Sequence, residues 1–208
     1  MNFRLYGTNQ CSNRFPARAR QGKIVSAGQF TLPGMFVLAA LFLGDGLLAT
    51  AASSSPTWPD IRRRIAKSFP QVPAITTVRL ARWLGDDKRL KPVLLDVRSR
   101  EEYEISHLPG AVWAETEKQQ RAVLDGQPPA RPVVLYCSVG WRSARAADRL
   151  LQGGGRTVWN LDGSIFQWAN EARPLVDAAN KTTHHVHPYD RSWGSLLERR
   201  RWSHDPSS

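Results

Sequence analysis

Short apolar runs alternate with stretches of helical spacing along the second half of the chain. Val133 to Tyr136 is a run of β-branched, aliphatic and aromatic residues after Pro132, a pattern that predicts a buried strand. Ser143 to Leu151 is rich in alanine and repeats apolar residues at helical spacing, so it predicts a helix. Strands that alternate with short helices predict an α/β fold with a mainly parallel sheet. Further strands are expected at residues 75–77, 93–97, 157–161 and around Val112, and further helices at residues 60–69, 77–83, 99–105, 119–124 and 166–171.

Polar residues mark where two of these helices begin. Ser99, with Glu102 three residues later, has the spacing of a capping box. Thr77 is the expected N-cap of the helix that ends near Trp83.

A cysteine lies between the strand at 133–136 and the helix at 143–151. In a strand, loop and helix of this kind, the loop amides and the positive end of the helix dipole point at the start of the loop, where Cys137 stands. Arg142 and Arg145 are close in sequence, so the setting predicts a lowered pKa and a reactive thiolate. Most free cysteines are instead small hydrophobic residues. Because open α/β sheets bind ligands at the carboxyl ends of their strands, we interpret Cys137 as a nucleophile.

The composition is that of a globular protein with a basic excess. The chain has 208 residues, 41% of them hydrophobic, and a formal net charge of +11. Residues 1–34 contain five basic residues and no acidic one, whereas residues 53–208 contain 24 Lys and Arg against 17 Asp and Glu. This balance favours small anions or an acidic surface. No nucleic-acid recognition motif is present, so nucleic acid is not an expected partner.

Residues 1–52 have the three parts of a secretory signal peptide. A basic segment is followed by the apolar run Met35 to Leu43 and then by small residues up to Ala51 and Ala52. This pattern predicts export, to the periplasm, after cleavage near Ala51 or Ala52. Because Asp45 interrupts the apolar stretch, a membrane anchor and a cytoplasmic protein with a wrongly chosen start codon remain alternatives. Membrane contact is expected only through this segment, and its removal would leave Cys137 as the one thiol.

Residues 53–74 are expected to form a linker and an amphipathic helix. Ile61, Ile65 and Phe69 make one apolar stripe, and basic residues lie elsewhere around the helix. We expect the stripe to dock on the domain and the basic face to lie in solvent, with membrane or partner binding by that face as the alternative. The rest of the chain divides into a domain at residues 75–177 and a C-terminal extension at residues 178–208.

Three histidines, at positions 184, 185 and 187, cluster in the C-terminal extension. A metal site needs three or four converging ligands, and the chain has only two other histidines, His107 and His204. No metal and no cofactor are expected, and the extension is expected to pack along the domain. Whether residues 189–202 pack there or recruit a partner is open, as is the oligomeric state.

Three separated motifs resemble those of rhodanese-like domains. The first runs from Asp96-Val-Arg98 through Glu102-Tyr103 to His107-Leu-Pro109-Gly110-Ala111, the second is Tyr136-Cys137-Ser-Val-Gly140-Trp-Arg142-Ser143, and the third is Leu161-Asp-Gly163 with Trp168 and Pro174-Leu175. Together they cover about residues 75–176, half the chain. The resemblance implies a rhodanese-like fold, a mainly parallel five-stranded sheet flanked by helices on both faces.

The resemblance also implies sulfurtransferase chemistry through a cysteine persulfide. Cys137 would take sulfane sulfur from a small anionic donor such as thiosulfate and pass it to a thiol acceptor. Arg142 is expected to bind the sulfonate end of the donor or to brace the loop, and Trp141 to select the acceptor or simply to pack. Substrate binding is thus assigned to the active-site loop, Ser138, Val139, Gly140, Trp141, Arg142 and Ser143.

Four residues of the first motif are expected to support the site structurally: Asp96, Arg98, Glu102 and His107. Asp96 and Arg98 are expected to tie this motif to the loop by hydrogen bonds. His107 is interpreted as a histidine bound into a turn rather than as a base, because a preformed thiolate needs no general base.

Two alternatives to a sulfurtransferase stay open. One is a catalytically idle rhodanese-like module that binds a partner or senses redox state through its thiol. The other is a phosphatase or arsenate reductase on the same scaffold. The phosphatase relatives have Cys-x5-Arg, whereas the spacing from Cys137 to Arg142 is Cys-x4-Arg, a shorter loop that suits a sulfur atom better than a phosphate.

Overall fold

The structure, a computed structural model, describes residues 55–205. These residues belong to one compact unit of the chain. The expected leader, with its cleavage point near Ala51 or Ala52, lies outside the described residues. Within residues 55–205, no helix is both long enough and apolar enough to cross a membrane.

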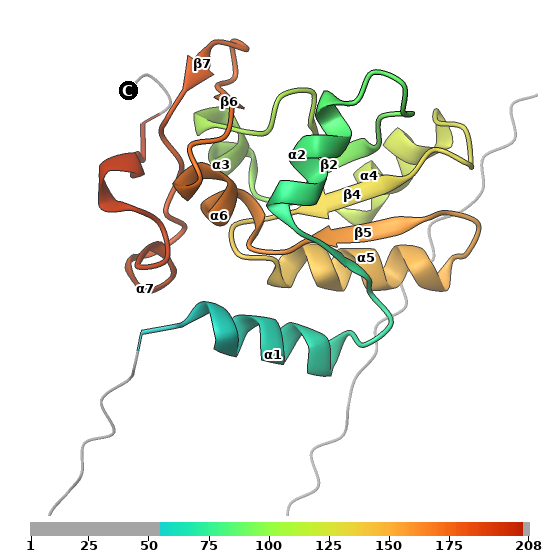
Figure 1. The fold of residues 1–208 in the computed structure, drawn as a ribbon, viewed down its shortest axis with the longest axis horizontal. Helices are drawn as coiled ribbons and strands as arrows, with labels where there is room; N and C mark the ends of the chain where they lie inside the picture. The colour runs from blue at the N-terminus through green and yellow to red at the C-terminus, as the bar shows by residue number, and fades with distance from the viewer. Residues whose placement is uncertain (1–54, 206–208) are drawn as a thin grey trace, which may run out of the picture. The chain divides into compact units, whose positions relative to one another are not determined.

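A five-stranded parallel sheet forms the centre of the fold (Figure 1). The strands lie in the order β1-β5-β4-β2-β3, and each neighbouring pair is parallel. All four residues of β2 and all four of β4 are buried, as the unbroken apolar runs predict for strands covered on both faces. The bounds of the strands are β1 Ala74–Ile75, β2 Val93–Asp96, β3 Val112–Trp113, β4 Val133–Tyr136 and β5 Val158–Leu161.

Helices cover both faces of this sheet. On one face, α2 (Thr77–Gly85) and α6 (Ser164–Asn170) pack their apolar side chains on the strands. On the other face, α4 (Glu117–Asp125) and α5 (Trp141–Gln152) do the same. The expected fold class, a mainly parallel five-stranded sheet flanked by helices, is confirmed.

The expected amphipathic helix is α1, Trp58–Ser68, which packs against α5. Ile61 is buried in the core, and Ile65 packs against the same cluster, so the apolar stripe docks on the domain as expected. The expected cap of α2 is wrong by one residue. Thr76, in extended conformation, accepts the N–H of Arg79, while the Thr77 hydroxyl donates to the Glu171 carboxylate.

The C-terminal extension packs on the domain. A hairpin of β6 (Leu175–Val176) and β7 (Thr182–Thr183) joins residues on either side of position 177. After it come α7 (Arg191–Gly194) and a 3-10 helix, Arg199–Arg201. Val186 and Leu197 of this extension are buried in the same cluster as α2 and α6. The described part of the extension therefore belongs to the domain core.

Candidate active site

Cys137 stands directly after β4, at the carboxyl end of the central strand, and α5 begins four residues later at Trp141. The Cys137 and Ser138 carbonyls accept the N–H groups of Ile165 and Phe166, at 3.1 Å each. These bonds hold the loop against the start of α6 and provide two of its carbonyls with hydrogen-bond donors.

The loop turns at Gly140, whose φ of +105° lies in the left-handed region. A Cβ at this position would also lie 3.3 Å from Ile65 Cδ1, a tight contact with α1. The Asn160 side chain holds the turn by donating to the Gly140 carbonyl at 3.1 Å. Glycine is therefore favoured at position 140 for two reasons: it adopts the left-handed backbone conformation without strain, and it leaves room for Ile65 of α1.

Hydrogen-bond donors surround the sulfur of Cys137, which is 1% exposed. The Gly140 N–H donates to Sγ at 3.2 Å, and the Ser143 hydroxyl lies 3.5 Å away. Burial by itself raises the pKa of the Cys137 thiol, but the charge of Arg142 and the donors on Ser143 and Gly140 outweigh it, so the pKa is lowered. The thiolate expected from the sequence is consistent with this geometry.

The Ser143 hydroxyl has a second acceptor within reach. It lies 2.7 Å from Oδ1 of Asn160, closer than it lies to the sulfur. Because a hydroxyl has one hydrogen, the two acceptors compete for it. A negative charge on Cys137 shifts that competition toward the sulfur, since charge-assisted hydrogen bonds are the stronger ones.

Arg142 braces the loop through Glu102 on α3 (Arg100–Ile105). Its two terminal nitrogens donate to the two oxygens of the Glu102 carboxylate at 2.7 and 2.8 Å, and Ser138 donates to the same carboxylate at 2.9 Å. Burial raises the pKa of Glu102, but the hydrogen bond from Arg142 and the charges of Arg98 and Arg142 lower it to about 2. Arg142 was expected either to bind the donor or to brace the loop, and its hydrogen bonds to Glu102 are those of a brace.

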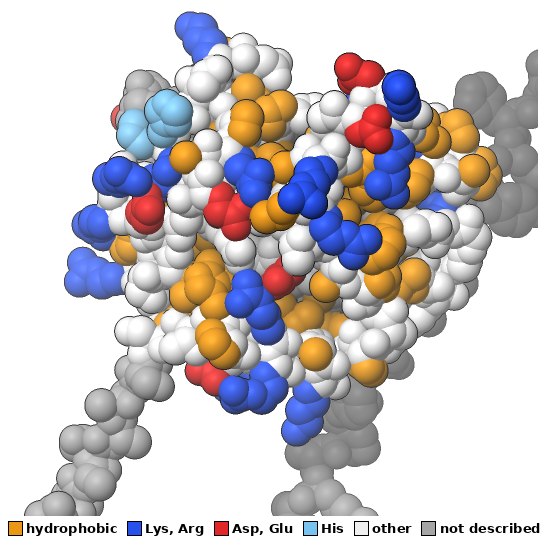
Figure 2. Space-filling model, in the orientation of Figure 1, with side chains coloured by type: hydrophobic (Ala, Val, Ile, Leu, Met, Phe, Trp, Pro, Cys, Tyr) orange, Lys and Arg blue, Asp and Glu red, His pale blue; other side chains and the backbone are white. Residues whose placement is uncertain are grey.

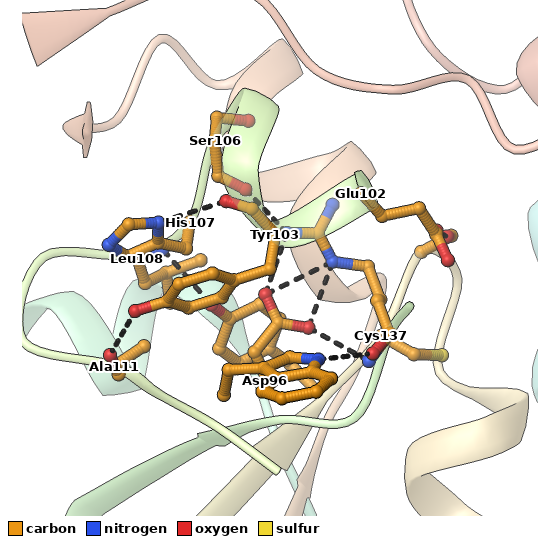
Figure 3. A network of polar contacts seen from close by, with 12 residues as sticks. Asp96, Glu102, Tyr103, Ser106, His107, Leu108, Ala111 and Cys137 are labelled. Carbon is orange, nitrogen blue, oxygen red and sulfur yellow. Dashed lines mark hydrogen bonds and ion pairs between the residues drawn. The ribbon is translucent and has the colours of Figure 1, made fainter. Parts of the chain in front are cut away.

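Asp96 and Arg98 make a fully buried ion pair, and Figure 3 shows Asp96 within the network of polar contacts of the first motif. The Asp96 carboxylate accepts Nε and Nη2 of Arg98, and Nη2 also donates to the carbonyl of Ser106. The pair therefore joins the end of β2 to the backbone at Ser106, and both lie within the first motif. The expectation that this pair ties the motif to the loop stays a prediction. The observed link to residues 138–142 is made by Glu102, whose carboxylate accepts hydrogen bonds from Ser138 and Arg142.

Glu102 has this role in addition to its capping box. Ser99 and Glu102 exchange both hydrogen bonds of the box, as the spacing predicted. The carboxylate thus joins the start of α3 to the loop.

His107 is bound into a turn, as expected. Its Nδ1 lies 3.1 Å from the carbonyl of Tyr103, and the two rings stack with centroids 3.9 Å apart. The Tyr103 hydroxyl donates to the carbonyl of Ala111, which closes the turn (Figure 3). His107 makes no hydrogen bond with Cys137, so it supports the fold of the first motif.

A small cavity of about 110 Å³ opens over the sulfur. Trp141 and Val139 form part of its wall, and Arg142 and Ser138 also line it. Two further walls, Tyr189 and Trp193, come from the C-terminal extension. The sequence left open whether residues 189–202 pack on the domain or recruit a partner, and it assigned neither Tyr189 nor Trp193 to the site. Their aromatic side chains, in a segment with no clear period, were the available signal.

Tyr189 has two features that fit a binding site. Its backbone φ is +68°, a conformation that is strained for a tyrosine, and its N–H donates to Nδ1 of His187. The guanidinium of Arg142 lies 4.8 Å from the centre of its ring, a cation–π contact. The extension is thereby attached to the same arginine that braces the active-site loop.

The histidine cluster does not come together around a common point. His187 pairs with His204 instead, with ring nitrogens 3.2 Å apart. Across residues 55–205 there is no group of three or more His, Cys, Asp or Glu side chains arranged to hold a metal ion.

Known proteins resemble this chain over the same region. The rhodanese-like domain family matches residues 76–171. Over 101 residues the chain is 34% identical to the probable adenylyltransferase/sulfurtransferase MoeZ of Mycobacterium tuberculosis, a match that covers 48% of this chain and 25% of that protein. Over 86 residues it is 31% identical to the tRNA uridine(34) hydroxylase of Citrobacter koseri, covering 39% of this chain and 25% of that protein.

The chain therefore spans about a quarter of the length of these curated relatives. Among solved structures, the thiosulfate sulfurtransferase of Pseudomonas aeruginosa superposes with a TM-score of 0.50 and 18% identity over 66% of this chain and 26% of that one. That likeness shows the fold. Residues 76–171 are a rhodanese-like domain.

Proposed function

We propose that this protein is a sulfurtransferase that carries sulfane sulfur as a persulfide on Cys137. The observation that carries the proposal is the contact of the Gly140 N–H with Sγ at 3.2 Å, in a setting that lowers the pKa of the thiol. A buried cysteine without these donors would stay protonated, because burial opposes charge. Relatives that are named sulfurtransferases lend the proposal further support.

The first step would load the cysteine. The Cys137 thiolate attacks the outer sulfur of thiosulfate, a bond forms between Sγ and that sulfur, and the bond to the sulfonate sulfur breaks with release of sulfite. No proton and no oxidant is needed. The negative charge moves from Sγ to the new outer sulfur, which stays within the N-terminal field of α5.

The size of the cavity favours a small donor. Its volume of about 110 Å³ is well below the roughly 300 Å³ at which pockets for drug-sized ligands begin. A second, unloading step by an acceptor thiolate or by cyanide would return Cys137 to its thiolate form.

The arrangement of Arg142 argues against a phosphatase. A phosphatase arginine must turn both of its outer nitrogens toward a phosphate. In this protein both are bound to Glu102.

The test is the intact mass of the purified full chain before and after treatment with thiosulfate. We expect the protein to gain the mass of one sulfur atom and to lose it to cyanide, with thiocyanate formed. The chain has two cysteines, so Cys137→Ser and Cys11→Ser form a matched pair. The gain should vanish in the first variant and persist in the second.

A folded protein with a reduced Cys137 that gains no sulfur and forms no thiocyanate would refute the proposal. It would leave a module that binds a partner or senses redox state.

A further inference from the structure

A second hollow lies beside the cavity at Cys137, between α1 and α7. Its volume is about 620 Å³, several times that of the cavity over the sulfur. This size suits a ligand of a few amino-acid residues. We call it the α1 groove, and its walls are Ser55, Pro56, Asp60, Ile61, Arg63, Arg64, Trp141, Ser192 and Trp193.

Two tryptophans connect the α1 groove to the cavity at the cysteine. Trp141 and Trp193 line both of them. Trp141 is 39% exposed and packs edge-on against Phe69, with ring centroids 5.3 Å apart. A molecule that lies in the α1 groove therefore reaches the mouth of the cavity along these two rings.

The α1 groove has a positive wall. Arg63 and Arg64 lie on it, and Figure 2 shows Lys and Arg side chains gathered over α1. Asp60, the acid that lines the groove, is already engaged: Thr57 donates to its carboxylate at 2.6 Å and Arg63 at 2.9 Å. Within residues 55–205, Arg64 makes no ion pair, so its charge is available to a ligand.

We propose that the α1 groove holds a short acidic peptide that carries the acceptor thiol. Its carboxylates would lie on Arg63 and Arg64, and its thiol would reach the cavity past Trp141 and Trp193. The inference rests on the sulfurtransferase function proposed above and adds to it the chemical class of the acceptor.

The transfer step balances without an added reactant. The peptide thiol first gives its proton to the outer sulfur of the Cys137 persulfide anion, and the resulting peptide thiolate attacks that sulfur. A bond forms between the peptide sulfur and the outer sulfur, the bond to Sγ breaks, and Cys137 leaves as a thiolate. The product is the peptide persulfide, and the departing thiolate is stabilised by the donors that stabilise it before loading.

The test uses the full chain, thiosulfate as the donor, and three synthetic peptides that share one cysteine. Two Asp, two Asn or two Lys residues follow this cysteine. The KM and kcat of each peptide are measured by release of sulfite. We expect the Asp peptide to have the lowest KM and the three kcat values to be similar, because the charges act on binding and not on the reacting sulfur atoms.

The variant Arg63→Gln/Arg64→Gln removes the positive wall. We expect the KM of the Asp peptide to rise roughly three- to tenfold and that of the Asn peptide to stay unchanged, the range expected for two exposed ion pairs. Salt should have the same selective effect. The control Lys118→Gln/Arg121→Gln removes two charges from α4, outside the α1 groove, and should leave both KM values unchanged.

Thiocyanate formation with cyanide separates the two proposals. If the wild-type protein forms thiocyanate from cyanide but the three peptides have equal KM values, the acidic acceptor is refuted and the sulfurtransferase stands. The same holds if the α1 variant raises the KM of Asp and Asn peptides equally. Absence of both persulfide and thiocyanate in the wild-type protein would refute the proposed function itself.

Discussion

The ion pair between Glu102 and Arg142 is expected to stabilise the fold in a way that depends on pH. The side chain of Glu102 is 3% exposed and its carboxylate accepts both terminal nitrogens of Arg142. Its pKa falls from an ordinary 4.5 to about 2, and each pKa unit is worth about 1.4 kcal/mol, so the ionised carboxylate contributes about 3 kcal/mol at pH 7.

The sign of the pH dependence follows from the direction of this shift. The folded-state pKa lies below the unfolded one, so the contribution is complete above pH 4.5 and is lost as the pH falls toward about 2. Glu102→Gln keeps the shape of the side chain but removes the charge. The variant should therefore be less stable than the wild-type protein by about 3 kcal/mol at pH 7 and by less than half of that at pH 3.

Urea unfolding followed by tryptophan fluorescence at both pH values measures this difference. Glu104→Gln is the matched control, since Glu104 pairs with Arg100 one turn along the exposed face of α3. Such a pair is worth about 0.5 kcal/mol or less at either pH. If Glu102→Gln is no more destabilising than Glu104→Gln at pH 7, or equally destabilising at pH 3 and pH 7, the account of this carboxylate is wrong.

Three further outcomes follow from the same structure. Gly140→Ala should lower the free energy of unfolding by about 1–3 kcal/mol more than Gly154→Ala, because both positions have positive φ but only Gly140 has close neighbours; equal losses would contradict this. The rate of alkylation of Cys137 by iodoacetamide should reach half its maximum at a lower pH than that of a free cysteine, and a higher midpoint would contradict the lowered pKa. Leu197→Ala should cost about 2–4 kcal/mol in urea unfolding, whereas the exposed Leu90→Ala should cost less than about 0.5 kcal/mol; a small loss at Leu197 would show that the extension does not share the core.

Features that depend on neighbours in sequence could be predicted from the chain. The strand before Cys137, the helix after it and the capping box at Ser99 are each written in a few consecutive residues. The contact of Glu102 with Ser138 and Arg142 spans 36 and 40 residues, and no local pattern encodes it. Because the capping box already explained Glu102, its spacing gave no sign of a second partner.

The same reasoning explains why the far wall of the site could not be predicted. Tyr189 and Trp193 lie beyond position 171, where the match to the rhodanese-like family ends, and their segment has no hydrophobic period that predicts an element. They reach the cavity because the hairpin of β6 and β7 and the burial of Leu197 return the chain to the core. Four of the five strands of the sheet and Cys137, the proposed nucleophile, thus lie inside the family match, whereas two walls of the cavity at Cys137 lie outside it. We therefore expect relatives with the same loop but a different extension to share the loading step at the cysteine and to differ in the acceptor.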